Sequence, residues 1–303
     1  MIRPLLFAGA AALAVLNGSS AGAKPDMQLP APETVADRGA PGYSFESLRI
    51  VSADGERAYR LRVGIPLGPP PPQGYAALWM LDGNAALAYV DEALLAELAE
   101  TGPPVIVAIG HDSPLRLDGV ERVRDYTPGA GSQDAFGRKG GGADAFLDLI
   151  EMQMKPAVAA LAPLNPGAQA VWGHSLGGLF VLHTLLERPG AFDLYFATSP
   201  ALWWNEREIL GALGDAPPRL EPCRCTVIVA RGSVGSPKQG RTPIRPQDAV
   251  SREDEDAFLA ELARFPGLAL RRIDYPGLSH GETMEVSIPD ALRAAAALPP
   301  GKE

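Results

Sequence analysis

The residues best suited to chemistry in this 303-residue chain form the pattern G-x-S-x-G, at Gly173-His174-Ser175-Leu176-Gly177. An apolar strand-like run, Ala168–Trp172, precedes the pattern, and a helical run, Leu176–Arg188, follows it. A tight strand-to-helix turn strains the serine and exposes its hydroxyl, and the glycines allow the close backbone approach that the turn needs. The turn also leaves the Leu176 amide at a helix N-terminus, where it can stabilise an oxyanion. We therefore expect Ser175 to be a nucleophile.

A serine hydroxyl needs a base to take its proton, and the sequence offers four histidines. His174 adjoins Ser175 and cannot fold back onto its hydroxyl, and His183 lies about two helical turns further on, where packing or capping is expected. His111 follows a predicted strand, so it could line the site or be satisfied within its loop. His280 lies just beyond the last predicted strand, 105 residues after Ser175. The order of serine and then histidine agrees with the α/β-hydrolase arrangement, so we expect His280 to be the base.

The acid that would orient this histidine is not fixed by the sequence. It is expected near the end of the predicted strand Thr226–Arg231, but the residues Gly232–Gly235 carry no carboxylate. The next acids along the chain are Asp248, Glu253, Asp254, Glu255 and Asp256. Most of them fall in the first turn of a predicted helix, where acidic residues are favoured by the helix dipole in any case. Either one of these acids reaches back to His280, or the enzyme works with a Ser–His dyad.

A second oxyanion donor is expected in the loop after the predicted strand Tyr75–Leu81. That loop reads Asp82-Gly83-Asn84, and its small residues leave backbone amides accessible, so Gly83 or Asn84 could donate. The same sequence is also typical of a helix-capping turn, and the two roles are compatible.

Alternating strand-like and helix-like segments must position these residues. Strands are predicted at 43–51, 59–65, 75–81, 105–110, 168–173, 194–199, 226–231 and 268–275, and helices at 85–100, 143–161 with a bend at Pro156, 176–188, 253–265 and 288–298. Continuous apolar strands separated by helices indicate a mostly parallel central sheet with helices on both faces. The first two strands flank the turn Ala53-Asp54-Gly55 and predict an antiparallel hairpin at one edge. We expect a single α/β domain over residues 42–300.

Composition narrows the range of functions. The formal net charge of −9 argues against nucleic acid as the main partner. The two cysteines and the spacing of the four histidines suggest neither a structural zinc site nor a catalytic metal, and the expected reaction needs no cofactor.

The first 23 residues are typical of a signal peptide. Arg3 supplies the positive start, Leu5–Leu16 is an apolar run too short for stable membrane insertion, and Ala21-Gly22-Ala23 resembles a cleavage site. We expect a periplasmic or secreted protein that begins near Lys24, with a flexible lead-in over residues 24–41. An oxidising compartment would permit a disulfide between Cys223 and Cys225, although the close spacing leaves free thiols equally open.

Motifs along the whole chain add a family resemblance. They are Leu81–Ala85, Arg122–Pro128, Gly141–Leu147, Gly173–Phe180, Ser199–Asn205 and Ser279–Gly281. With these motifs the chain resembles the esterase branch of the α/β hydrolases, and within it the catecholate siderophore esterases that open the trilactone of enterobactin and salmochelin. The resemblance implies ester hydrolysis by Ser175 and His280, in a branch where a dyad is thought sufficient, with Arg122 or Arg124 meeting the substrate.

The expected partner is therefore a small-molecule ester, with a ferric siderophore as one form of it. An anionic ferric catecholate would be repelled by the overall charge, but the stretch Arg231–Arg252 carries a local charge of +4. Arginines stack on aromatic rings and bind oxyanions, and Trp203 and Trp204 could offer ring contacts. A solvated loop and ordinary packing are the alternatives for these two features. The competing functions are a serine esterase or acyltransferase for another ester (feruloyl, short-chain acyl or thioester) and a non-catalytic binding protein on the same scaffold.

Overall fold

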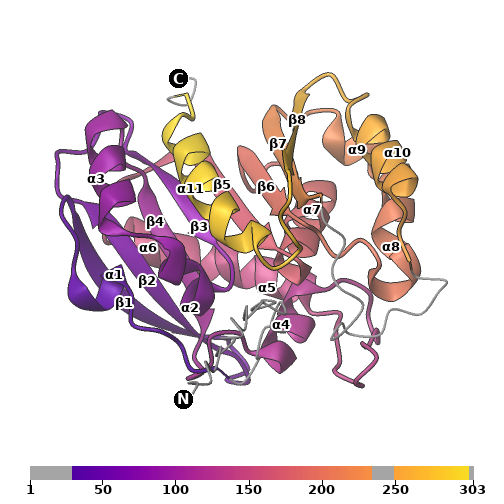
Figure 1. Cartoon of the computed structure of the whole chain (residues 1–303), viewed down its shortest axis with the longest axis horizontal. Coiled ribbons are helices and arrows are strands. Elements are labelled where there is room, and N and C mark those ends of the chain that lie inside the picture. Colours follow the sequence, from indigo (N-terminus) through magenta and orange to yellow (C-terminus); the bar gives the residue numbers. More distant parts are fainter. Residues whose placement is uncertain (1–28, 234–248, 300–303) are drawn as a thin grey trace, which may run out of the picture.

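The computed structural model describes residues 29–233 and 249–299 (Figure 1). The predicted signal peptide and residues 234–248 of the basic insert lie outside the described residues.

The described residues form one eight-stranded sheet with the strand order β1-β2-β4-β3-β5-β6-β7-β8. The strands are β1 (Tyr43–Val51), β2 (Ala58–Pro66), β3 (Tyr75–Met80), β4 (Val105–His111), β5 (Leu164–His174), β6 (Leu194–Thr198), β7 (Cys225–Gly232) and β8 (Leu268–Tyr275). The β1–β2 and β2–β4 pairs are antiparallel, and the other pairs are parallel. The predicted fold class, a mostly parallel sheet with an antiparallel N-terminal hairpin, is confirmed.

Helices cover both faces of this sheet. They are α1 (Val35–Arg38), α2 (Gly83–Ala86), α3 (Glu92–Thr101), α4 (Gly119–Tyr126), α5 (Ala143–Leu149), α6 (Lys155–Ala159), α7 (Leu176–Glu187), α8 (Trp204–Ala212), α9 (Pro217–Leu220), α10 (Arg252–Leu262) and α11 (Thr283–Ala296). One core joins the sheet to α1, α2, α3 and α11, and a second joins it to α4 through α10. In Figure 1, α11 crosses the middle of the sheet, and it contacts β3, β5, β6 and β7.

Alternation along the strands explains why two cores form. In β3, Ala77 and Trp79 face one core while Leu78 and Met80 face the other, and all four side chains are fully buried. Successive side chains of a strand point to opposite faces, so a continuous apolar run can be satisfied only by helices on both sides.

Two predicted helices differ from the expectation: one is broken, and the other is continuous but contains a π-helical turn. The predicted helix 85–100 breaks before α3, because Asp91 adopts extended backbone and its side chain accepts a hydrogen bond from the Leu94 amide at 2.8 Å. The predicted helix 143–161 runs without a stop to Ala159, but its middle turn, Ile150–Met154, is a π-helix. Pro156 has no amide donor and its ring crowds the carbonyl four residues earlier, so a wider turn beside it relieves the clash.

The described part of the expected lead-in, residues 29–41, contacts the folded domain. The Ala31 amide donates to the Pro114 carbonyl at 2.8 Å, and the Arg116 amide donates to the Leu29 carbonyl at 2.8 Å. Thr34 then caps α1, and Val35 is completely buried. The folded unit therefore begins by residue 29, because one apolar anchor and a short bridge fix a segment whose composition alone favours a loop.

The structure also settles one alternative that the sequence left open. Cys223 and Cys225 form a disulfide, with their Cα atoms 5.7 Å apart. Among residues 29–233 and 249–299, no helix combines the length and the apolar character needed to cross a bilayer.

The topology brings three loops together. Parallel strands end at the same edge of a sheet, so the segments that follow β3, β5 and β8 emerge on one side. These segments contain Gly83, Ser175 and His280, the residues that the sequence singled out for chemistry.

Candidate active site

Ser175 sits in a strained turn between β5 and α7. Its φ of 59° and ψ of −114° lie outside the regions that non-glycine residues prefer, as expected for a nucleophile on a sharp strand-to-helix turn. The Ser175 amide donates to the Thr198 carbonyl at 2.9 Å, and its carbonyl accepts from the Ala201 amide at 3.0 Å. Hydrogen bonds to the next loop thus hold the turn against its own strain.

Two glycines make the turn possible. A Cβ on Gly173 would lie 2.3 Å from the Gly177 carbonyl oxygen, and one on Gly178 would lie 2.9 Å from the Thr198 carbonyl oxygen. Because both neighbours are backbone atoms that cannot move aside, the tight packing of α7 against β5 and β6 requires glycine at these positions.

The structure brings the predicted base to the predicted nucleophile. His280 Nε2 lies 3.1 Å from Ser175 Oγ, within hydrogen-bond reach. His280 belongs to the segment between β8 and α11, and both side chains are half-buried.

The other three histidines have different partners. His183 Nε2 lies 2.7 Å from Asp144 Oδ1, which agrees with the packing role expected for it. His111 is buried, with Nε2 3.0 Å from Asp125 Oδ2, and so is satisfied within the protein.

His174 is buried directly beneath the site. Its Nε2–H donates to the carbonyl oxygen of His280 at 2.7 Å, and the two rings are 4.8 Å apart. Burial lowers the pKa of His174 to about 4, the hydrogen bond to His280 opposes this shift, and the charge of Arg122 adds to it. His174 is therefore neutral at neutral pH.

The turn after β3 lies beside the start of α7. The Leu81 amide donates to the Trp172 carbonyl of β5 at 3.0 Å, and Asp82 Oδ2 is 3.8 Å from the position of a Cβ on Gly177. Gly83 begins α2 and Leu176 begins α7, so neither amide has a partner within its own helix. This arrangement suits the predicted pair of oxyanion donors.

Asn84, the alternative donor, has its side chain engaged elsewhere. Its amide group lies between 3.0 and 3.3 Å from three carbonyl oxygens, those of His111, Ser113 and Leu115. Asn84 therefore fixes the loop after β4 to the start of α2.

Arg122 is buried in an ion pair with Asp82, in the turn after β3. Its Nε and Nη2 donate to the two oxygens of Asp82 at 2.6 and 2.9 Å, and the arginine is 8% exposed. The Tyr126 hydroxyl accepts from the Asp82 amide at 3.1 Å. The Arg122 guanidinium thus holds the Asp82–Gly83 turn, where Asp82 takes a left-handed φ of 54°, and this ion pair argues against the expected contact between Arg122 and the substrate.

Arg124 keeps some exposed surface. Its side chain is 30% exposed, while Nε donates to Asp125 Oδ1 at 2.9 Å and Nη2 pairs with Glu121. Asp125 is completely buried and also accepts from the Tyr59 hydroxyl at 2.6 Å. Burial alone would raise the pKa of Asp125, but its hydrogen bonds with His111 and Arg124 hold it below the ordinary value.

The two tryptophans, Trp203 and Trp204, differ in burial. Trp204 is 2% exposed and its Nε1–H donates to the Pro128 carbonyl at 3.1 Å, so it packs the core and is not placed as a substrate contact. Trp203 is half-buried, with its ring 6.0 Å from that of Trp204, and remains a candidate for ring contacts.

Two of the candidate acids on α10 already have arginine partners. Asp254 forms a capping box with Ser251 and pairs with Arg207 at 3.2 Å, and Glu255 pairs with Arg231 at 3.0 Å. Glu253 is exposed in the same turn, and Asp248 lies outside the described residues. These contacts argue against Asp254 and Glu255 as the acid that orients His280.

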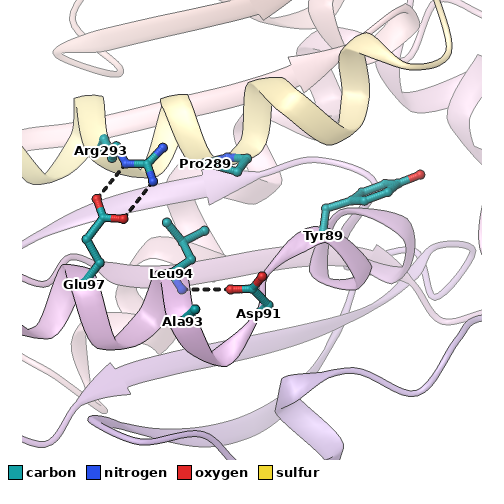
Figure 2. A pocket seen from close by; sticks show the side chains of 7 residues that line it. All are labelled: Tyr89, Asp91, Ala93, Leu94, Glu97, Pro289 and Arg293. Atoms are coloured by element: carbon teal, nitrogen blue, oxygen red, sulfur yellow. Dashed lines mark hydrogen bonds and ion pairs between the residues drawn. The ribbon is translucent and has the colours of Figure 1, made fainter.

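Two surface hollows do not coincide with this site. One, of about 250 Å³, lies between α3 and α11 and contains the Arg293–Glu97 pair (Figure 2). The other, of about 460 Å³, lies between α8 and α10. Within the described residues, no group of three or more His, Cys, Asp or Glu side chains is placed to hold a metal ion.

The buried ion pair beneath the Asp82 turn predicts a large effect of substitution. Arg122→Gln would leave the Asp82 carboxylate buried and uncompensated, so we expect the free energy of unfolding in urea to fall by about 3–5 kcal/mol. Arg293→Gln breaks a bidentate pair of the same geometry whose two side chains are 49% and 45% exposed, and should cost about 1 kcal/mol or less. Equal losses in the two variants would contradict a special role for the buried pair.

The lowered pKa of His174 predicts a loss of stability in acid. The unfolded chain takes up a proton near the ordinary histidine pKa of about 6.5, whereas the folded chain does so only near about 4. Stability should therefore fall as the pH drops from about 6.5 to about 4, by roughly 3 kcal/mol from this group. In His174→Gln, urea unfolding across this pH range should show a correspondingly shallower slope, and an unchanged slope would contradict the assignment.

Comparison with known proteins places the chain in a family. The family model described as "Putative esterase" matches residues 52–222. Apo-salmochelin esterase of Escherichia coli is 34% identical over 276 residues, which cover 89% of this chain and 84% of that protein. Ferri-bacillibactin esterase BesA of Bacillus subtilis is 38% identical over 176 residues, which cover 54% of this chain and 61% of that protein.

A solved structure of the same kind of enzyme also matches the fold of this chain. Enterobactin hydrolase IroE, in complex with DFP, matches with a TM-score of 0.74 at 32% identity, over 87% of this chain and 99% of that one. With an eight-stranded sheet of the same kind and a serine and a histidine in contact at its edge, the chain belongs to this esterase family of the α/β hydrolases.

Proposed function

We propose that this protein hydrolyses the ester bonds of a catecholate siderophore, with Ser175 as the nucleophile and His280 as the general base. The single observation that carries the mechanism is the 3.1 Å contact between Ser175 Oγ and His280 Nε2 at a strained turn. The substrate class rests on the relatives, whose names record salmochelin, bacillibactin and enterobactin as what they act on.

The geometry supports an acyl-enzyme mechanism. Ser175 Oγ attacks the ester carbonyl carbon as His280 Nε2 takes the hydroxyl proton. The Gly83 and Leu176 amides stabilise the oxyanion of the tetrahedral intermediate, and His280 returns the proton to the departing alkoxide. Water then attacks the acyl-enzyme while His280 again takes and returns a proton, which frees the carboxylic acid and Ser175.

Two partly exposed side chains suit a catecholate. The Arg124 guanidinium can form hydrogen bonds to oxyanions and stack on aromatic rings, and Trp203 offers a ring face. Both belong to segments joined to the site. Arg124 lies in α4, which holds the Asp82 turn through Arg122, and Trp203 follows Ala201, whose amide binds the Ser175 carbonyl.

Hydrolysis assays test the function directly. We expect the purified protein to open enterobactin, supplied iron-free and iron-loaded, with product acids followed by chromatography. Ser175→Ala and His280→Gln should each lower kcat by at least about 10³-fold, since the two groups act as a unit. Ser52→Ala, which alters a buried serine whose side chain bonds to Arg57 within the β1–β2 turn, should retain activity.

A short p-nitrophenyl ester separates the substrate from the mechanism. Cleavage of this ester without cleavage of either form of enterobactin would overturn the siderophore assignment. Substantial turnover by Ser175→Ala would overturn the mechanism.

We also propose that the protein is exported, with residues 1–23 removed. The charged start, apolar run and small-residue site support this, and a disulfide is typical of oxidising compartments. Mass spectrometry of the protein from a fractionated native host should find a chain beginning at Lys24 outside the cytoplasm. Recovery of the intact N-terminus in the cytoplasm would contradict export.

A further inference from the structure

The backbone carbonyl of His280 is held by two hydrogen-bond donors from different elements. His174 Nε2–H donates to it from the end of β5 at 2.7 Å, and Thr283 Oγ1–H donates to it from the first turn of α11 at 2.7 Å. Both donors therefore act on the backbone from which the imidazole extends. Thr283 is completely buried and His174 is 7% exposed, which shields these bonds from water.

The directions of these hydrogen bonds follow from their acceptors. A carbonyl oxygen cannot donate, so the proton of neutral His174 lies on Nε2 and the Thr283 hydroxyl proton points at His280. Ser199 Oγ lies 2.9 Å from Thr283 Oγ1 and must therefore donate to it. Ser199 itself has a left-handed φ of 44°, and its amide donates to the Ala230 carbonyl of β7 at 2.7 Å. The network thus ties the His280 segment to β5, β7 and α11.

His174 is the member of this network closest to the nucleophile. It directly precedes Ser175 and ends β5, where it pairs with Thr198 of β6. Its ring lies against the His280 ring, with centroids 4.8 Å apart and an angle of 51° between the planes. The same short stretch of backbone therefore presents the nucleophile and, through one side chain, holds the base.

We propose that His174 is a positioning residue, whose Nε2–H bond to the His280 carbonyl fixes the base at its distance from Ser175. The proposal rests on the proposed roles of Ser175 and His280. A displacement of about 1 Å in an active site can cost about 10²-fold in rate, so a lost anchor on the base should be visible in catalysis. The burial that keeps His174 neutral preserves its single Nε2 proton over the working pH range.

Two substitutions of His174 separate the hydrogen bond from packing. His174→Phe keeps a flat ring against His280 but removes the donor, and His174→Gln keeps an N–H donor near the position of Nε2. We expect His174→Phe to lower kcat for a p-nitrophenyl ester by about 10- to 100-fold with little change in KM. His174→Gln should recover most of this loss.

The rate at which diisopropyl fluorophosphate modifies Ser175 provides a second readout. This reagent needs the nucleophile and its base but no siderophore, and mass spectrometry follows it directly. The His174→Phe rate should fall in step with kcat. His183→Phe is the matched control, because it alters another buried histidine whose partner, Asp144, lies outside the site, and its rates should stay within about twofold of wild type.

Each outcome supports or overturns the proposal. Wild-type kcat and labelling rate in a folded His174→Phe protein would overturn it, as would an equal loss in His174→Phe and His174→Gln. If His174→Phe does not fold, Thr283→Val removes the other donor to the His280 carbonyl. An unchanged kcat in that variant would overturn the claim that hydrogen bonds to this carbonyl position the base. Failure of wild type to cleave enterobactin would refute the proposed substrate alone, whereas failure of Ser175 to react with the fluorophosphate would refute both proposals.

Discussion

The candidate active site is built around one contact, between a serine hydroxyl and an imidazole at the edge of a parallel sheet. Ser175 and His280 lie 105 residues apart in the sequence. They come together because β5 and β8 run in the same direction and end at the same edge of the sheet. The sheet brings the two segments to one edge, but it does not set the distance between Ser175 Oγ and His280 Nε2. That distance is set by short-range hydrogen bonds around Ser175 and around the His280 carbonyl, which convert an approximate arrangement into a contact of 3.1 Å.

The oxyanion side of the site depends on buried charge. Asp82 and Arg122 meet as a bidentate pair, and Tyr126 receives the Asp82 amide, so the left-handed turn before Gly83 is held through both its side chain and its backbone. Asp125, in the same helix, gathers Tyr59, His111 and Arg124 around a completely buried carboxylate. Burying charge is costly unless every partner is in place, so the native geometry here is the one arrangement that satisfies all of these groups.

Local patterns in the sequence predicted the parts of the molecule that local physics decides. The strands β1 and β8 begin and end where alternation and apolar runs place them, and the G-x-S-x-G motif with its flanking elements located the strained serine. Arg122 was assigned to the substrate through the family resemblance, and no local signal reveals its ion-pair partner, Asp82, 40 residues away. The docking of residues 29–41 escaped prediction for the same reason, since it is set by distant backbone atoms. Trp204 takes the packing role that the sequence had left open as an alternative, and its partner is the Pro128 carbonyl. The third member of a triad stays open, because Asp254 and Glu255 pair with Arg207 and Arg231, and Asp248 lies outside the described residues.

The position of His280 between β8 and α11 has a consequence for the order in which the parts of the site are synthesised. Seven strands, the glycine-lined turn and the charged cluster beneath it are all encoded before β8. A polypeptide that is interrupted ahead of Gly277 can contain each of these parts and still lack its proton acceptor. On the proposed mechanism, such a product carries the serine without the histidine that would take its proton, so the reactive pair is complete only when the final segment is present.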